Sequence, residues 1–267
     1  MTKTNSLIGN SSAPQETLSS LRERALHLGL HGVISHWDSI GAQAWLPTLI
    51  EYEEGERNRR NLQRRLQSAK LAQFKPMADF DWSWPKTIDR QAIEDLFSLN
   101  FIQEGANIVL VGGNGLGKTM IALNLVHNAI LNGYTAFAIS ASELLNDLTA
   151  QESSAALLRR LRHYATPQVL FIDELGYLAA SHEHADLLFE LINRRYQRKS
   201  VIITANKVFS EWKSVFPNAG CLLTMIDRII HKSEILTIDG ESYRAKEATE
   251  RAAQKLALRG KKNSSIK

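Results

Sequence analysis

A glycine-rich loop between an apolar strand and a helix constrains this chain more than any other feature. Residues 108–111 (IVLV) are typical of a buried strand, and the sequence GGNGLGKT follows at once. This is the phosphate-binding loop pattern, in which glycines let backbone amides converge on an anion at a helix N-terminus. We therefore expect an α/β protein that binds a nucleotide. The residues expected to hold its phosphates and cation are Gly112, Asn114, Gly115, Gly117, Lys118, Thr119 and Asp173.

A second apolar run, 169–172 (VLFI), ends in two adjacent carboxylates, Asp173 and Glu174. We expect Asp173 and the hydroxyl of Thr119 to bind magnesium, and Lys118 to bridge the β and γ phosphates. Glu174 is expected to orient and deprotonate the attacking water, so the second acid predicts hydrolysis. Because no clear guanine-reading Asn-Lys-x-Asp motif is present, ATP is favoured over GTP as the bound nucleotide.

Three further polar residues are candidates for the hydrolytic site. Asn206 follows the apolar run 201–204 and can hold the attacking water, although an ordinary turn asparagine is the alternative. Arg228 lies on an amphipathic segment, 222–230, and Arg244 follows the last apolar run. Either arginine can stabilise negative charge in the transition state, while a solvated helix position is the alternative for both.

The rest of the chain has a clear order. Apolar residues recur at helical spacing up to residue 71, which predicts a small all-α domain, and a proline-bounded aromatic stretch follows. Beyond it, short apolar runs alternate with helical segments, which predicts a parallel sheet flanked by helices. The predicted strands are 108–111, 136–139, 169–172, 201–204 and 235–238. The predicted parts are a disordered leader (1–14), an N-terminal helical domain (15–73), a linker (74–87), an ATPase domain (88–246) and a basic tail (247–267).

The charge is distributed unevenly along the chain. The formal net charge is only +4, but the segment 57–70 holds six basic residues and no acid, and the chain from Arg244 onward is also strongly basic. Basic patches on an otherwise acidic chain indicate a polyanionic partner such as DNA, because neutralised phosphates release counterions. A solvated helix face and a frayed tail are the alternative.

Composition excludes several other classes. A single cysteine, Cys221, cannot form an internal disulfide, and no Cys/His cluster has metal-ligand spacing. No apolar run is long enough to span a membrane, and the first residues are polar. We therefore expect a cytoplasmic protein without a membrane partner.

Further motifs carry a resemblance to a known family. They are LxLHG at 28–32, FDW at 80–82, DELGYL at 173–178, DLLF at 186–189, RRY at 194–196, FSEW at 209–212, DRIIH at 227–231 and GESYR at 240–244. With the phosphate loop, they make the chain resemble the IstB-type helper ATPases of insertion-sequence transposons over nearly its full length. That family belongs to the AAA+ superfamily and is related to the helicase loader DnaC.

The resemblance assigns roles to the remaining candidates. It implies that Asn206 is sensor 1, that Arg228 is an arginine finger reaching a neighbouring subunit's ATP, and that Arg244 is the sensor 2 arginine. It also implies an ATP-state homo-oligomer, a ring or helical filament, on double-stranded DNA, with a transposase as partner. The N-terminal domain would contact that partner or DNA. The DNA contacts are expected from one of two basic groups, namely Arg159, Arg160 and Arg162, or Arg60, Arg64 and Arg65.

Two other functions stay open at this point. A helicase loader has the same active site but prefers single-stranded DNA and grips a replicative helicase. A nucleotide-gated scaffold assembles on ATP binding and hydrolyses little. The leading hypothesis is that the protein is an ATPase that marks target DNA and recruits or activates a transposase.

Overall fold

The computed structural model describes residues 18–176, 181–217 and 219–264. The chain divides into two compact units, Met1–Gln63 and Arg64–Lys267. The predicted leader, 1–14, lies outside the described residues. Among the helices described, none is long and apolar enough to cross a membrane.

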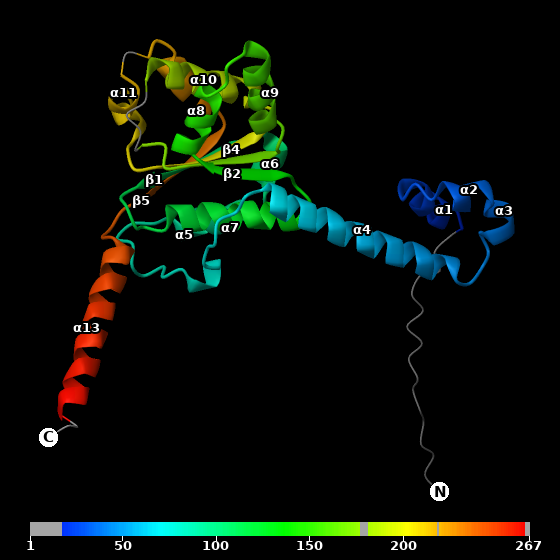
Figure 1. Ribbon diagram of the computed structural model, residues 1–267, viewed down its shortest axis with the longest axis horizontal. Helices are drawn as coiled ribbons and strands as arrows, with labels where there is room; N and C mark the ends of the chain where they lie inside the picture. Colours follow the sequence, from blue (N-terminus) through cyan, green and yellow to red (C-terminus); the bar gives the residue numbers. More distant parts are fainter. Residues whose placement is uncertain (1–17, 177–180, 218, 265–267) are drawn as a thin grey trace, which may run out of the picture. The chain divides into compact units, whose positions relative to one another are not determined.

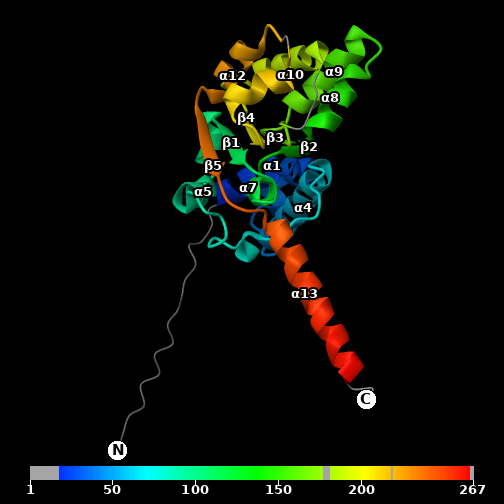
Figure 2. The same ribbon diagram turned by 90° about the vertical axis from the view of Figure 1, so that its left-hand side faces the viewer.

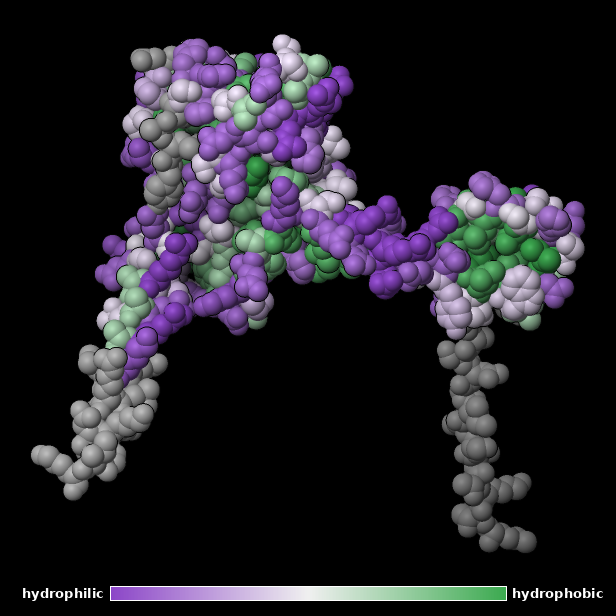
Figure 3. Space-filling view, viewed as in Figure 1, coloured by the Kyte–Doolittle hydropathy of each residue, from purple (hydrophilic) through white to green (hydrophobic). Residues whose placement is uncertain are grey.

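The first unit is all helical, as its apolar spacing predicts. Its helices are α1 (Leu18–His27), α2 (His31–Ser35), α3 (Trp37–Ile40) and most of α4 (Leu46–Ser68). Its small core consists of Leu21, Ala25, Leu28, Leu46 and Ile50. Figure 3 shows apolar area on the surface of this unit, and its exposed large side chains include Leu18, Leu26 and Trp45.

The second unit is built on a five-stranded parallel sheet with the order β2-β3-β4-β1-β5. All five predicted strands are confirmed, each extended by a residue or two. They are β1 (Asn107–Gly112), β2 (Ala136–Ser140), β3 (Val169–Asp173), β4 (Ser200–Ala205) and β5 (Ser233–Ile238). The order places β4 between β3 and β1, so the carboxyl ends of the two phosphate-site strands lie on either side of it.

Helices cover both faces of this sheet. Helix α7 (Lys118–Leu131) lies on one face, and α8 (Ala141–Thr149), α9 (Ser154–Ala165), α10 (His182–Arg195) and α12 (Leu222–Ile230) lie on the other (Figures 1 and 2). Successive side chains of a strand point to opposite faces of the sheet. Ile172 and Ile203 point to the face covered by α8 and α10 and belong to the core there. The remaining elements are α5 (Arg90–Leu96), α6 (Asn100–Glu104), α11 (Trp212–Val215), α13 (Tyr243–Ser264) and the 3₁₀ turns η1 (Met77–Asp79) and η2 (Phe209–Glu211).

The aromatic stretch that we predict as a linker, 74–87, packs on the ATPase unit. Lys75 pairs with Glu247 at 2.9 Å, Lys246 pairs with Asp81 at 3.4 Å, and Thr87 forms an antiparallel bridge with Asp239. The first compact unit ends at residue 63, within α4, and the stretch 74–87 belongs to the second unit. The physical reason is that aromatic side chains between two prolines gain more by packing on an apolar surface than by remaining in water.

Candidate nucleotide site

The phosphate loop joins β1 to α7 and has the geometry that its glycines predict. Gly115 and Gly117 have φ values of 73° and 89°, in the left-handed region that glycine adopts without strain. The ammonium group of Lys118, the first residue of α7, donates hydrogen bonds to the carbonyl oxygens of Gly112 (2.7 Å) and Gly113 (2.6 Å). The loop, the helix N-terminus and the lysine thus converge where an anion would bind.

Two distant segments hold this loop in place. The ring of Phe80 lies so close to Gly117 that a Cβ there would overlap it. On the other side, the backbone N–H of Tyr243 donates to the carbonyl oxygen of Gly115 at 2.9 Å. The loop is therefore supported both by the stretch 74–87 and by the turn that starts α13.

The two acids lie at the end of β3, next to the loop. The hydroxyl of Thr119 donates to Oδ1 of Asp173 at 3.0 Å. The backbone of Glu174 is left-handed, with φ of 60°, and its side chain lines the cavity beside the loop. The geometry brings together the loop threonine and the strand-end carboxylate, two hard oxygen donors of the kind that magnesium prefers.

Asn206 follows β4 and lies against Gly176. A Cβ at Gly176 would overlap Oδ1 of Asn206, so the amide oxygen faces the backbone of Gly176. Oδ1 is buried without a hydrogen-bond partner among the described residues. Asn206 is also one of the residues that line the cavity beside the phosphate loop.

One cavity of about 440 Å³ lies beside the phosphate loop; Gly112 and Asp173 do not line it, although Asp173 is hydrogen-bonded to Thr119, which does. Among the predicted residues, it is lined by Asn114, Gly115, Gly117, Lys118, Thr119, Glu174, Asn206 and Arg244. Burial lowers the pKa of Lys118. Of the neighbouring charges, the carboxylates of Asp173 and Glu174 raise this pKa, and the guanidinium of Arg244 lowers it. A site with two cations and two acids within electrostatic reach of one another is suited to a phosphate chain together with a divalent cation.

The two candidate arginines lie in different places. Arg244 lines the cavity. Arg228, on α12, does not line it; its guanidinium lies over the rings of Phe189 (4.8 Å) and Tyr196 (5.8 Å). Nη1 of Arg228 is buried and has no hydrogen-bond partner in the described part of the chain. The structure therefore places one arginine at this chain's own cavity and the other away from it.

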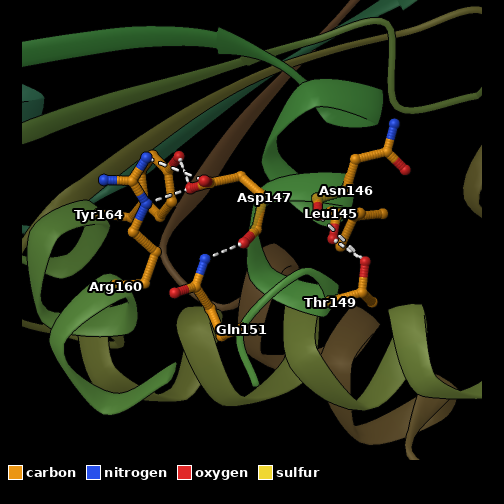
Figure 4. Close-up of polar contacts among 7 residues, drawn as sticks. All are labelled: Leu145, Asn146, Asp147, Thr149, Gln151, Arg160 and Tyr164. Carbon is orange, nitrogen blue, oxygen red and sulfur yellow. Dashed lines mark hydrogen bonds and ion pairs between the residues drawn. The ribbon is translucent and has the colours of Figure 1, made fainter. Parts of the chain in front are cut away.

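The α9 arginines, grouped in the sequence prediction, differ in the structure. Arg160 forms a two-pronged ion pair with Asp147 of α8, its Nη2 lying 2.9 Å from Oδ1, and Tyr164 donates to the same carboxylate (Figure 4). The hydrogen bond from Arg160 holds the pKa of Asp147 below its usual value. Arg159 and Arg162 are exposed, and neither pairs with a carboxylate among the described residues. Arg160 therefore joins α8 to α9.

The rival basic group lies on α4. Arg60 is an exposed residue of the first unit and pairs with Glu56 at 3.4 Å. Arg64 is exposed and Arg65 is half-buried, and both belong to the second unit. Further along, Lys70 lies 5.5 Å from the ring of Phe137.

Sequence reasoning missed two parts of the site. Phe80 and Trp84 line the cavity, and the indole of Trp84 donates to the carbonyl oxygen of Glu241 at 2.8 Å. Their signal is the aromatic cluster FDWSW, which is unusual for a free linker. Thr204, on β4, also lines the cavity. Its signal is weak, because a threonine near the end of an apolar strand is common.

The fold and the site together define an ATPase of the AAA+ P-loop class. The chain belongs to the family of IstB-like ATP binding proteins, whose family model matches residues 25–251. It is 35% identical to the ATP-binding protein of insertion sequence IS5376 from Geobacillus stearothermophilus, over 78% of this chain and 83% of that protein. It is also 35% identical to the ATP-binding protein of insertion sequence IS21 from Pseudomonas aeruginosa, over 78% of each chain. Membership of this family shows that the chain is an ATP-binding protein.

Solved structures support the fold. The chain resembles DnaI with a TM-score of 0.50 and 17% identity, over 62% of this chain and 89% of that one. It resembles the replication initiator DnaA bound to AMPPCP and single-stranded DNA with a TM-score of 0.50 and 16% identity, over 66% and 56% of the two chains. At these identities the likeness concerns the fold alone.

Proposed function

We propose that this protein is an ATP- and magnesium-dependent ATPase that assembles on double-stranded target DNA and recruits or activates a transposase. The observation that carries the proposal is its membership of a family whose relatives are ATP-binding proteins of insertion sequences. The cavity supports the hydrolytic part, because the loop, the lysine, Glu174 and one arginine line it, and Asp173 is hydrogen-bonded to Thr119, which also lines it.

The residues present fit ATP and magnesium. Lys118 would hold the β and γ phosphates, and Thr119 and Asp173 would hold magnesium, which would neutralise phosphate charge. In the described residues no three His, Cys, Asp or Glu side chains gather into a metal site, so phosphate and water oxygens would complete the coordination. Glu174 would accept the proton of the attacking water, and Asn206 would orient that water.

The placement of Arg228 supports assembly. Because this guanidinium lies outside its own chain's cavity and keeps an unpaired Nη1, we propose that it acts on the ATP of a neighbouring subunit. Phe189 and Tyr196 would hold it in position through contacts between the cation and their rings. Arg244 would act on the ATP of its own subunit. A site shared in this way makes hydrolysis depend on the oligomer.

The size of the complexes on DNA tests this function. With ATP, we expect large assemblies on duplex DNA by analytical sedimentation, and we expect them to dissolve when ADP replaces ATP. Preference for single-stranded DNA would instead favour a helicase loader, and ATP-dependent assembly without turnover would favour a nucleotide-gated scaffold. A monomer under every condition would contradict the proposal.

A surface that joins both basic regions supports DNA binding. The ring of Phe137 is contacted by Lys70, at the end of the first basic segment, and by His163 of α9. The ring centroids of Phe137 and His163 are 5.1 Å apart. Burial, Arg160 and Lys70 lower the pKa of His163, which disfavours the charged form of its ring. The cations exposed near this ring are therefore Lys70 and those of α9. Arg159, Arg162 and Lys70 are proposed to contact DNA phosphates.

Replacing both Arg159 and Arg162 by alanine is expected to weaken duplex binding and flatten its salt dependence. Two lost phosphate contacts should make the slope of log affinity against log salt shallower by about 2. The matched control is Arg160→Ala, which should keep the slope but lower the melting temperature, because Asp147 then loses its partner. Fluorescence anisotropy across a salt series measures the slopes, and an unchanged slope in the double variant would remove α9 from the DNA surface.

A further inference from the structure

Thr204 occupies a central position that the roles proposed above leave unexplained. It lies on β4, only 1% exposed, opposite Leu110 of β1. Its neighbour Ile203 pairs with Ile172 of β3, so the next residues along the two strands, Thr204 and Asp173, lie side by side. The sheet register therefore places a hydroxyl beside the strand-end carboxylate.

The pleat of the sheet directs both side chains to the same layer. Ile172 and Ile203 face the core under α8 and α10. Because successive strand residues point to opposite faces, Asp173 and Thr204 point to the side of α7, where Thr119 lies in the first turn of the helix. Three polar side chains from three elements thus meet at the loop end of the sheet.

The hydroxyl of Thr204 makes two different hydrogen bonds. It accepts one from the backbone N–H of Glu174 at 2.9 Å, and it donates one to Oδ1 of Asp173. A hydroxyl has one proton, and the amide can only donate, so the direction of both bonds is determined. One side chain therefore links the two acids of the site.

The bond that the hydroxyl donates orients Asp173. Its Oδ1 accepts from both Thr119 and Thr204. No donor in the described part of the chain reaches the second oxygen, Oδ2. The carboxylate is thus held in one orientation with one oxygen left for a cation or its water.

The bond that the hydroxyl accepts holds the backbone of Glu174. A glutamate with φ of 60° is in a conformation that L residues rarely adopt, and it persists only where its surroundings determine it. The hydroxyl of Thr204 holds the amide of this residue, and the next amide, of Leu175, donates to the carbonyl oxygen of Thr204 at 3.0 Å. Thr204 therefore fixes the turn that directs the Glu174 side chain to the cavity.

We propose that Thr204 is a positioning residue for ATP hydrolysis, which orients Asp173 towards magnesium and Glu174 towards the attacking water through one hydroxyl. This inference rests on the roles proposed above for those two acids. Thr204 itself is not expected to touch the nucleotide phosphates.

The test compares Thr204→Val, which has the same shape without the hydroxyl, with Thr204→Ser, which keeps it. In the valine variant we expect kcat to fall about 10–100-fold and the magnesium concentration for half-maximal tightening of ATP binding to rise about tenfold. ATP binding in EDTA should stay within about twofold of the wild type, because the loop and Lys118 are untouched. The serine variant should recover most of both properties.

The matched control is Ser200→Ala, at the opposite end of β4. Ser200 is also fully buried, and its hydroxyl donates to the carbonyl oxygen of Phe101 at 3.0 Å. This variant should lower the melting temperature but leave kcat and the magnesium dependence unchanged. Equal shifts in Ser200→Ala, or a serine variant as impaired as valine, would reduce Thr204 to a stabilising residue and overturn the proposal.

The outcomes separate this inference from the proposed function. A wild-type protein that binds ATP but does not hydrolyse it would contradict the hydrolytic function, while the magnesium dependence of binding would still decide the effect of Thr204 on Asp173. If the wild type hydrolyses ATP and the Thr204→Val variant has the same kcat and magnesium dependence, the inference about Thr204 is overturned and the proposed function stands.

Discussion

Replacing Lys118 by alanine is expected to reduce ATP hydrolysis at least about 100-fold, because the charge on the β and γ phosphates loses its fixed partner. The same variant should lose ATP-dependent assembly on DNA. Phosphate release at saturating ATP and sedimentation with ATP and duplex DNA measure the two effects. Lys213→Ala, on the exposed surface of α11, is the matched control and should behave as the wild type.

Mixing subunits extends this experiment to the arginine finger. Subunits with Lys118→Ala keep Arg228, and subunits with Arg228→Ala keep an intact cavity. If the finger acts across the interface, the mixture should hydrolyse more ATP than the two variants measured separately. A mixture no more active than their sum, or normal assembly by Lys118→Ala alone, would contradict the shared site.

The second large effect is expected on stability, from Arg195→Met. Arg195, the last residue of α10, is 1% exposed and donates to five backbone carbonyl oxygens. Its acceptors are those of Tyr164, Ala165, Pro167, Gln168 and Ser200. These carbonyls belong to the end of α9, the approach to β3 and the start of β4. Burial lowers the pKa of the guanidinium to about 9, so the group is charged at neutral pH and its hydrogen bonds are charge-assisted.

Methionine fills similar space but cannot donate, so the variant leaves buried acceptors unpaired. We expect a loss of about 3 kcal/mol or more in the free energy of unfolding, and a melting temperature lower by about 6–12 °C. The control is the adjacent Arg194→Met, since Arg194 pairs with Glu190 at 2.8 Å in a partly exposed position and should cost less than about 1 kcal/mol. Thermal and urea unfolding measure both; equal stability of the two variants would contradict the role given to Arg195.

Much of the fold follows from local patterns. The five strands could be predicted because each is a short apolar run bounded by turns. Such runs are typical of parallel strands that are covered by helices on both faces of the sheet. The phosphate loop could be predicted because its glycines and its lysine have a local reason for their spacing. Amphipathic spacing likewise predicted 222–230, which is the span of α12.

The structure decided what depends on distant segments. The stretch 74–87 has the composition of a linker, and only tertiary contacts show that Phe80 packs on the loop and Trp84 on the turn before α13. The three α9 arginines look alike in sequence, yet the rotation of the helix turns Arg160 towards Asp147 and leaves Arg159 and Arg162 exposed.

The sequence by itself determined the class of chemistry, because the residues that bind phosphates and activate water are set by short motifs whose geometry is local, such as Lys118 after its glycines and Glu174 after its strand. Only the tertiary structure decided how those groups are held. Thr204 reaches Asp173 through sheet register, and Arg195 reaches its five carbonyls through the packing of α10 on α9. Such contacts join residues far apart in the chain, so no local pattern of residues records them.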